Sequence, residues 1–179
     1  MRVITGTARG RKLKEPQGME IRPTTELVKE AMFSIIQFDI EGRRVLDLFG
    51  GTGQLGIEAA SRGAREVVIV DESRAAMKII RENAEHCKLS QIKTVQTESI
   101  GYLRRGEKFD IILIDPPYDT LLAEKALETA TEFDILSNGG IIVCETRTNK
   151  LLPKLEKPYF LRKEYSYGQV KLSVYEKEN

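Results

Sequence analysis

Length, composition and charge already exclude several classes of protein. The chain has 179 residues, 41% hydrophobic and 31% charged, as in an ordinary globular protein, and we expect residues 1–179 to form one domain. With a net charge of +1, any affinity for nucleic acid must come from local patches. Two distant cysteines without metal-ligand spacing, and no signal-peptide or transmembrane pattern, lead us to expect reduced thiols, no metal, no membrane association and a cytoplasmic location.

Two elements are expected ahead of an alternating core. Residues 1–22 are predicted to form a basic arm or small hairpin. Residues 23–38 are predicted to be a helix, because Pro23 followed by threonine is typical of a helix start. Apolar residues at helical spacing follow, and we expect this stripe to pack against a sheet; it comprises Leu27, Ala31, Met32 and Ile35.

From residue 43 onward, short apolar runs alternate with helical patterns. A parallel sheet with helices on both faces is the fold that such alternation predicts. The expected strands cover residues 43–49, 66–71, 93–98, 109–115 and 139–146, and the expected helices lie within 50–63, 72–89, 100–104 and 120–133. Residues 159–176 alternate between polar and apolar and turn near Gly168, which predicts a C-terminal antiparallel hairpin.

Basic residues gather in two stretches of the chain. Residues 1–14 contain several Lys and Arg and no acid, and residues 147–163 contain several more against Glu156 alone. Either stretch by itself is typical of a solvated surface, but two of them in a nearly neutral chain favour a polyanionic partner. The residues that we expect to contact phosphates are Arg9, Arg11 and Lys12.

A glycine-rich turn follows the first expected strand, in the stretch VLDLFGGTGQLG. Asp47 ends that strand, and glycines after it let the backbone approach a ligand closely, although a tight turn alone would also use them. The second strand ends on Asp71, where a carboxylate can accept hydrogen bonds from ribose hydroxyls. The predicted cofactor-binding residues are Asp47, Gly50, Gly51, Gly53, Asp71, Glu98 and Ser99.

The position of Asp47 favours one nucleotide cofactor. An acid just before the turn would repel a phosphate at the helix N-terminus, and the chain contains no GK[ST] phosphate loop. S-adenosylmethionine offers an ammonium group to Asp47 and ribose hydroxyls to Asp71. Its adenine can lie near the end of the third strand, at Glu98 and Ser99. We therefore predict S-adenosylmethionine as the cofactor.

The fourth expected strand, in IILIDPPYDT, ends on Asp115, Pro116, Pro117 and Tyr118, which we predict to be catalytic. In a doubly wound sheet this strand lies beside the first, at the ligand-binding crevice. The prolines hold the preceding residues extended, so the Asp115 carboxylate and the Pro116 carbonyl can both accept hydrogens of an exocyclic NH2. Tyr118 can stack on an extruded base. The other interpretation is that Asp-Pro-Pro only ends a strand.

Together, DLFGGTG, VD and DPPY resemble the amino-directed S-adenosylmethionine-dependent methyltransferases. The longer stretches TGTARGRKL, RPTTELVKEAMFSI, VLDLFGGTGQLGIEAASRGA and YSYGQVKLSVYE resemble the RsmD-type family, bacterial enzymes that methylate the exocyclic N2 of one guanine, position 966, in 16S rRNA. The resemblance implies a Rossmann-like α/β fold with a seven-stranded methyltransferase sheet, a catalytic core over residues 43–179 and a cofactor contact from Phe49. It also implies 16S rRNA, in the assembled or assembling small ribosomal subunit, as partner. Separately, we expect the protein to be a monomer.

Three other functions stay open from the sequence. DNA adenine or cytosine amino methyltransferases share the DPPY stretch, but they usually carry a separate recognition domain, for which 179 residues leave no room. A protein-glutamine methyltransferase also presents a planar amide to its cofactor, but usually has Asn where this chain has Asp115. A non-catalytic RNA-binding module would bind no cofactor and would have no use for an acid between a strand and two prolines.

Overall fold

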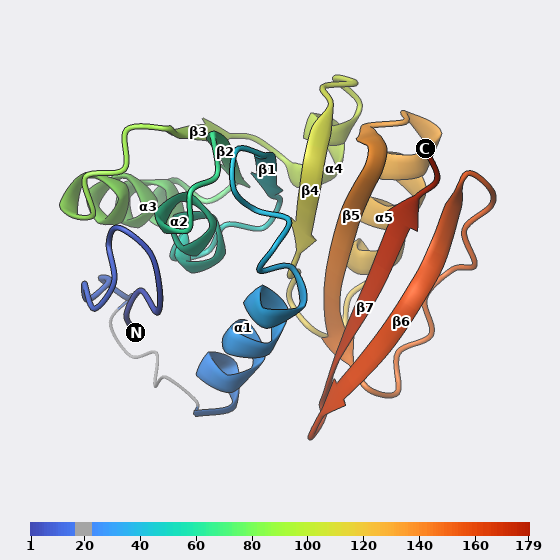
Figure 1. The fold of residues 1–179 in the computed structure, drawn as a ribbon, viewed down its shortest axis with the longest axis horizontal. Helices are drawn as coiled ribbons and strands as arrows, with labels where there is room; N and C mark the ends of the chain where they lie inside the picture. The colour runs from blue at the N-terminus through green and yellow to red at the C-terminus, as the bar shows by residue number, and fades with distance from the viewer. Residues whose placement is uncertain (17–22) are drawn as a thin grey trace.

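The computed structural model is built around one seven-stranded sheet with the strand order β3-β2-β1-β4-β5-β7-β6 (Figure 1). It describes residues 1–16 and 23–179, so residues 17–22 of the predicted arm lie outside the described part. The helices are α1 (Pro23–Ile35), α2 (Gln54–Ser61), α3 (Arg74–His86), α4 (Ser99–Leu103) and α5 (Leu122–Glu132). The strands are β1 (Arg44–Asp47), β2 (Glu66–Asp71), β3 (Ile92–Gln96), β4 (Phe109–Ile114), β5 (Leu136–Arg147), β6 (Tyr159–Tyr167) and β7 (Val170–Lys177).

The first five strands run parallel, and β7 runs antiparallel to both of its neighbours. The hairpin of β6 and β7 turns at Gly168, whose φ of 59° favours glycine. Because β7 pairs with β5 as well as with β6, the last strand lies inside the sheet and β6 forms its edge. The predicted sheet with its C-terminal antiparallel hairpin is confirmed.

Four of the five predicted parallel strands have different bounds in the structure: β1 and β4 are shorter than predicted, and β3 and β5 differ at both ends. β5 begins at Leu136, ahead of the predicted start at Gly139. The pair Gly139-Gly140 resembles a turn in the sequence, but in the structure it lies within the strand. Gly139 has a φ of 68°, and the register between β4 and β5 shifts at Phe109. β3 ends at Gln96, so Glu98 is not a strand residue: it is the N-cap of α4.

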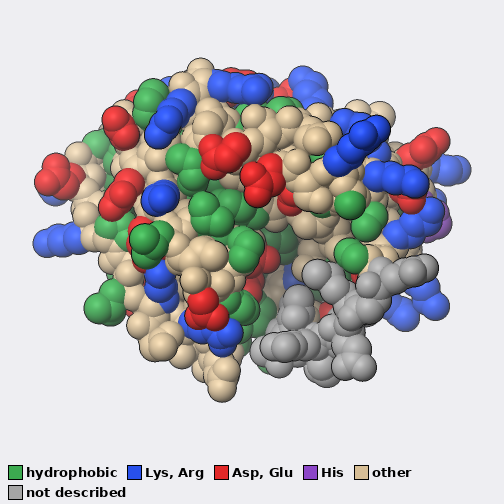
Figure 2. Space-filling model, turned by 180° about the vertical axis from the view of Figure 1, so that it is seen from behind, with side chains coloured by type: hydrophobic (Ala, Val, Ile, Leu, Met, Phe, Trp, Pro, Cys, Tyr) green, Lys and Arg blue, Asp and Glu red, His purple; other side chains and the backbone are tan. Residues whose placement is uncertain are grey.

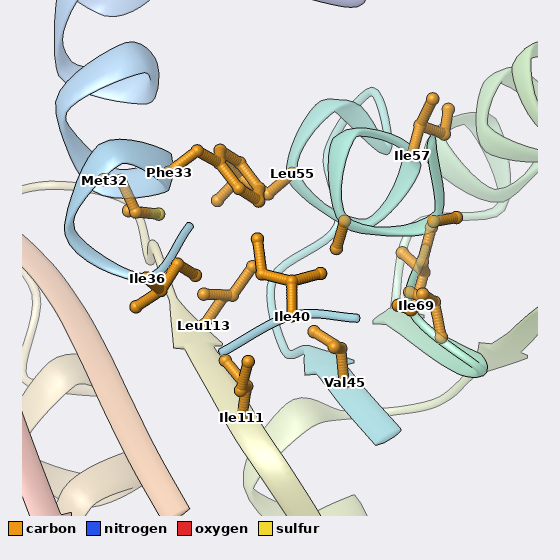
Figure 3. Packing of buried hydrophobic residues seen from close by; sticks show 14 of the residues in the cluster. Met32, Phe33, Ile36, Ile40, Val45, Leu55, Ile57, Ile69, Ile111 and Leu113 are labelled. Carbon is orange, nitrogen blue, oxygen red and sulfur yellow. The ribbon is translucent and has the colours of Figure 1, made fainter. Parts of the chain in front are cut away.

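Helices cover both faces of the sheet, and each face has its own apolar core. α1, α2 and α3 bury residues such as Met32 and Ile80 on one face, whereas α4 and α5 bury residues such as Leu103 and Leu127 on the other. Figure 3 shows side chains of α1 meeting those of β1 and β4 in the first core. Completely buried Phe33 is among them; its truncation to alanine would cost about 3–5 kcal/mol.

The apolar stripe of α1 is rotated relative to the prediction. Leu27, expected in the core, is 54% exposed, while Met32 is buried as expected. Ala31 and Ile35 are partly buried at the edge of the cluster. The face that enters the core is centred on Val28, Met32, Phe33 and Ile36, because these residues recur at intervals of three and four.

The N-terminal segment, residues 1–13, folds back on itself and packs on α2. Arg2 and Lys12 form an antiparallel bridge. Glu58 of α2, fully buried, accepts backbone hydrogen bonds from Ile4 and Thr5 at 2.8 and 3.0 Å. Because a buried carboxylate is costly without partners, these bonds fix the segment firmly in place.

Both cysteines are buried and free, which agrees with the prediction of reduced thiols. Within residues 1–16 and 23–179, no helix has the length and apolar character that crossing a membrane requires.

Candidate active site

The carboxyl ends of β1, β2, β4 and β5 lie at one edge of the sheet, and a cavity of about 580 Å³ opens there, which we call the main cavity. Most of the predicted cofactor-binding and catalytic residues form its wall together. The residues lining it are Phe49, Gly51, Asp71, Glu72, Glu98, Ser99, Asp115, Pro116, Pro117, Tyr118, Leu122 and Glu145.

The charge of the main cavity is acidic. Its wall holds five carboxylates, and no Lys, Arg or His from the described residues lines it. Such a wall repels phosphate and suits a cationic ligand that also carries hydroxyl groups. The sulfonium, ammonium and ribose groups of S-adenosylmethionine have these properties, so the residues present fit the predicted cofactor. The volume lies in the range of small-molecule sites.

Asp71, at the end of β2, is organised by the glycine turn. Its Oδ2 accepts a hydrogen bond of 2.9 Å from the amide of Gly51, and its Oδ1 accepts one of 2.8 Å from the amide of Ser73. Gly51 has a φ of 57°, and nothing within 4 Å would meet a Cβ there. Each carboxylate oxygen has a second lone pair, so Asp71 can still accept a hydrogen bond from a ligand.

Asp47 lies beneath the cavity and is only 1% exposed. Its Oδ2 accepts a hydrogen bond of 2.9 Å from the amide of Gly56, and its Oδ1 has no partner among the described residues. Burial, together with the charge of Asp71, raises the pKa of Asp47 to about 7. Asp47 is therefore a poorly neutralised acid under the floor of the cavity, and its predicted contact with a cofactor ammonium stays a prediction.

Gly50 and Gly53 do not line the main cavity, and the structure gives another reason for a glycine at each of these positions. A Cβ on Gly50 would lie 2.5 Å from Cγ2 of Ile69, which belongs to β2. Gly53, with a φ of 80°, is the N-cap of α2 and packs near Ile80 of α3. These two glycines let the turn and α2 approach the sheet closely, and that approach brings Gly51 to the cavity.

Glu98 and Ser99, predicted to lie near the adenine, line the main cavity at the start of α4. Both carboxylate oxygens of Glu98 accept backbone hydrogen bonds, from Ile100 at 2.8 Å and Gly101 at 2.6 Å. The Ser99 hydroxyl donates to the carbonyl of Leu48 at 2.7 Å. Glu98 therefore caps the N-terminus of α4, and Ser99 connects this end of α4 to the residue that follows β1.

Asp115 follows β4 directly and forms part of the cavity wall. Burial raises the pKa of its carboxyl well above the usual range, and the charges of Glu145 and Asp47 raise it further. The causes of the shift are burial and neighbouring acids, and no cation is among them.

Tyr118 is 38% exposed and stands between the main cavity and a second one. Its hydroxyl donates a hydrogen bond of 2.6 Å to Oε1 of Glu145, and the Arg147 guanidinium lies 4.8 Å from the centre of its ring. The second cavity has a volume of about 410 Å³ and shares Pro116, Pro117, Tyr118 and Glu145 with the main cavity. Tyr118 is thus an aromatic wall that the two cavities have in common.

Sequence reasoning missed Glu72, Leu122 and above all Glu145 among the residues of the wall. Glu145 lies near the end of β5, the strand beside β4. A signal was present: IIVCE ends an apolar run on an acid, just as IILID does.

The predicted phosphate-binding residues lie in the N-terminal segment. Arg9 and Lys12 are exposed, whereas Arg11 is half-buried and donates a hydrogen bond to the backbone carbonyl of His86. In Figure 2, which views the molecule from behind, Lys and Arg side chains are densest at the right, the end where α3 and the N-terminal segment lie. In the other basic stretch, Arg147 and Lys150 pair with acids, namely Asp119 and Glu124.

Proteins named as methyltransferases resemble this chain over nearly its whole length. Residues 1–176 match the family described as Conserved hypothetical protein 95. The chain is 34% identical to "Putative rRNA methyltransferase YlbH" of Bacillus subtilis, over 99% of both chains. It is 30% identical to "Ribosomal RNA small subunit methyltransferase D" of Escherichia coli, over 99% of this chain and 90% of the relative.

A solved structure gives the same result. The "Putative methyltransferase yhhF" of Escherichia coli superimposes with a TM-score of 0.90 at 31% identity, over 99% of this chain and 98% of the other. The match extends from the N-terminal segment to β7 and includes the elements that form both cavities. The chain therefore belongs to the Conserved hypothetical protein 95 family, the RsmD-type family that its sequence resembles.

Proposed function

We propose that the protein methylates the exocyclic N2 of a guanine in 16S rRNA, using S-adenosylmethionine. The observation that carries the proposal is the main cavity, whose wall joins Asp71 and Gly51 to Asp115 and Tyr118. The names of the relatives support rRNA as the substrate. S-adenosylmethionine supplies, when bound, an electrophilic methyl group bonded to its sulfonium sulfur.

In this proposal Asp71 holds the ribose hydroxyls of the cofactor and Gly51 allows the ligand to approach the backbone. The acidic wall favours a cationic cofactor over its neutral product, because charge is stabilised by nearby carboxylates. Release of the product after the reaction is favoured for the same reason. Glu98 and Ser99 shape the region for the adenine from the start of α4.

Asp115 and Pro116 orient the reacting amine. The nitrogen of an exocyclic NH2 is a weak nucleophile because its lone pair is delocalised into the ring. Hydrogen bonds accepted by the Asp115 carboxylate and the Pro116 carbonyl pull the nitrogen toward tetrahedral geometry and stabilise the positive charge that develops on it. The amine loses its proton after methyl transfer, and Asp115, whose pKa is raised, can receive it.

Tyr118 provides the surface on which the extruded base stacks, an interaction worth about 1–3 kcal/mol in single-stranded nucleic-acid sites. Arg147, above the ring of Tyr118, adds positive charge at the cavity rim, where a phosphate of the extruded nucleotide can lie. Arg9, Arg11 and Lys12 bind more distant phosphates and set affinity without reading sequence.

The experiment that tests the proposal offers tritiated S-adenosylmethionine to four substrates in parallel: small ribosomal subunits, naked 16S rRNA, duplex DNA and release-factor protein. We expect label in rRNA or small subunits, and digestion to nucleosides should recover it as N2-methylguanosine. Label in DNA or protein, or at another position of the base, would overturn the proposal. A preparation of Asp115→Ala serves as the negative control. Any label that it still transfers comes from contaminating methyltransferases.

A further inference from the structure

Glu145 lies beside the catalytic stretch on a neighbouring strand. β4 and β5 are parallel, with Ile114 paired to Cys144, so the next residues along these strands are Asp115 and Glu145. Both residues line the main cavity, and Glu145 also lines the second cavity. A ligand that reaches Asp115 past Tyr118 must therefore meet Glu145.

The carboxylate of Glu145 is only partly used within the protein. Oε1 accepts the hydrogen bond from Tyr118, and among the described residues no hydrogen bond or ion pair reaches Oε2. Arg147, two residues later, pairs with Asp119 instead. Burial raises the pKa of Glu145, and its charge also raises the pKa of Asp115. Two neighbouring acids without a cation suit a ligand with several donors on one edge.

Guanine has such an edge, and the other amino-bearing bases do not. Next to the N2 amino group, guanine carries N1–H, a further donor. Adenine has the acceptor N1 beside its amino group, and cytosine has the acceptor N3. A carboxylate facing that position attracts guanine and repels adenine and cytosine.

We propose that Glu145 selects guanine by accepting a hydrogen bond from N1–H while Asp115 and Pro116 hold the N2 amino group. The inference rests on the proposed function and deepens it, because it assigns the residue that determines which base is accepted. It also explains why a site with DPPY, a stretch shared with enzymes acting on adenine or cytosine, would exclude those bases.

The test combines a change in the protein with a change in the base. Once the target guanine has been mapped, 16S rRNA is assembled with 2-aminopurine at that position. 2-Aminopurine keeps the 2-amino group but has an acceptor at N1, like adenine. The wild-type enzyme should prefer guanine strongly. With 2-aminopurine, which lacks N1–H, the Glu145 carboxylate would face an acceptor and lose its hydrogen bond.

Glu145→Gln should reverse part of this preference. Gln Oε1 can still accept the hydrogen bond from Tyr118, which places an NH2 donor where Glu145 has Oε2. Against guanine, the NH2 faces N1–H and repels it; against 2-aminopurine, it donates to N1. We expect kcat/KM for guanine to fall about 10- to 100-fold and the ratio of guanine to 2-aminopurine turnover to fall by at least about tenfold.

Two further variants separate base reading from a purely structural role. Tyr118→Phe removes the hydroxyl that is hydrogen-bonded to Glu145 but keeps the Glu145 carboxylate as acceptor. Turnover of the guanine and 2-aminopurine substrates should therefore fall by a similar factor. Glu176→Gln, on β7 and paired with Arg162, is the matched substitution away from both cavities and should leave the ratio unchanged. Urea unfolding of all variants should give similar midpoints, which confirms that they are folded.

The outcomes distinguish the inference from the proposed function. An unchanged ratio in Glu145→Gln, or no detectable turnover of 2-aminopurine by that variant, would overturn the reading of N1–H while leaving guanine methylation intact. Failure to find N2-methylguanosine with the wild-type enzyme and unmodified rRNA would instead overturn the proposed function.

Discussion

The amide of Gly56 donates a hydrogen bond of 2.9 Å to the buried carboxylate of Asp47, which joins the first turn of α2 to the end of β1 beneath the main cavity. This bond is the only hydrogen bond that the described residues give to the Asp47 carboxylate, and its Oδ1 has no partner. Asp47 is therefore held in a position that costs free energy in its charged form.

This relationship predicts how stability depends on pH. Because the pKa of Asp47 is about 7 in the folded protein, against 3.8 as its ordinary value, the folded state binds the proton more tightly. Stability from this group is fully present below pH 3.8 and is lost as pH rises to 7. Between pH 5 and pH 8 the free energy of unfolding of the wild type should fall by up to about 3 kcal/mol more than that of Asp47→Asn. Each pKa unit corresponds to about 1.4 kcal/mol.

Urea unfolding of the two proteins at pH 5 and pH 8, without ligand, measures this difference. Other acids titrate in both proteins, so the comparison isolates Asp47. Equal losses of unfolding free energy in wild type and Asp47→Asn would contradict the prediction, because they would show that Asp47 is already charged at pH 5 in the folded protein.

Asp115→Ala should remove most turnover and leave cofactor affinity largely unchanged. The substitution deletes one of the two proposed acceptors for the amine, and losses of about 100- to 1000-fold are typical when one stabilising group for the transition state is removed. Calorimetry with S-adenosylmethionine and methyl-transfer kinetics on the same preparation measure the two effects. Asp110→Ala, at the opposite end of β4, is the control and should keep its kcat. Near-normal turnover of Asp115→Ala would reject the mechanism.

Gly6→Ala should release the N-terminal segment from α2. Gly6 has a φ of +90°, and a Cβ there would lie 1.8 Å from the backbone oxygen of Ser61. Gly10, with a φ of +81° and nothing within 4 Å, provides a matched control for backbone strain alone. We expect Gly10→Ala to cost about 1–2 kcal/mol and Gly6→Ala distinctly more, with faster proteolysis of residues 1–13. Equal costs in urea unfolding would mean that the segment does not depend on this close approach.

Arg9→Ala combined with Arg11→Ala should weaken rRNA binding and flatten its salt dependence. Removal of one cation that pairs with a phosphate reduces the slope of log K against log salt by about 0.7–0.9, so the double variant should reduce it by about 1.4–1.8. Filter binding to the rRNA substrate between low and moderate salt measures the slope. Lys125→Ala, on α5 across the sheet, should leave it unchanged, and an unchanged slope in the double variant would refute the phosphate-binding role.

Much of the fold was predictable because its signals are local. Apolar runs of strand length alternate with helical spacing from residue 43 onward, and a parallel sheet follows from that alternation. The site was predictable for a related reason: in such a sheet, residues that end neighbouring strands meet at one edge. Asp71 and Asp115 could therefore be placed together from their positions at the ends of β2 and β4 alone.

The parts that were missed depend on interactions between distant residues. Glu58 and Ser61 belong to a short helix, and the N-terminal segment, more than 50 residues away, supplies backbone partners that help to make their burial favourable. The sequence predicts a basic arm or small hairpin, and the antiparallel bridge between Arg2 and Lys12 agrees with the hairpin, but its hydrogen bonds to α2 were not predicted. Similarly, nothing in the chain near Glu145 indicates that Tyr118 would approach it; the pairing of β4 with β5 brings them together.

The place of β7 between β5 and β6 has a consequence for how the protein is made. β6 leaves the ribosome before β7 does and has no partner until Val170–Lys177 has emerged. The edge of β5 that faces β7 is likewise unpaired during this interval, and exposed strand edges are prone to aggregation. The sheet can thus be completed only after β7 has emerged, when this one strand covers the free edges of β5 and β6 together.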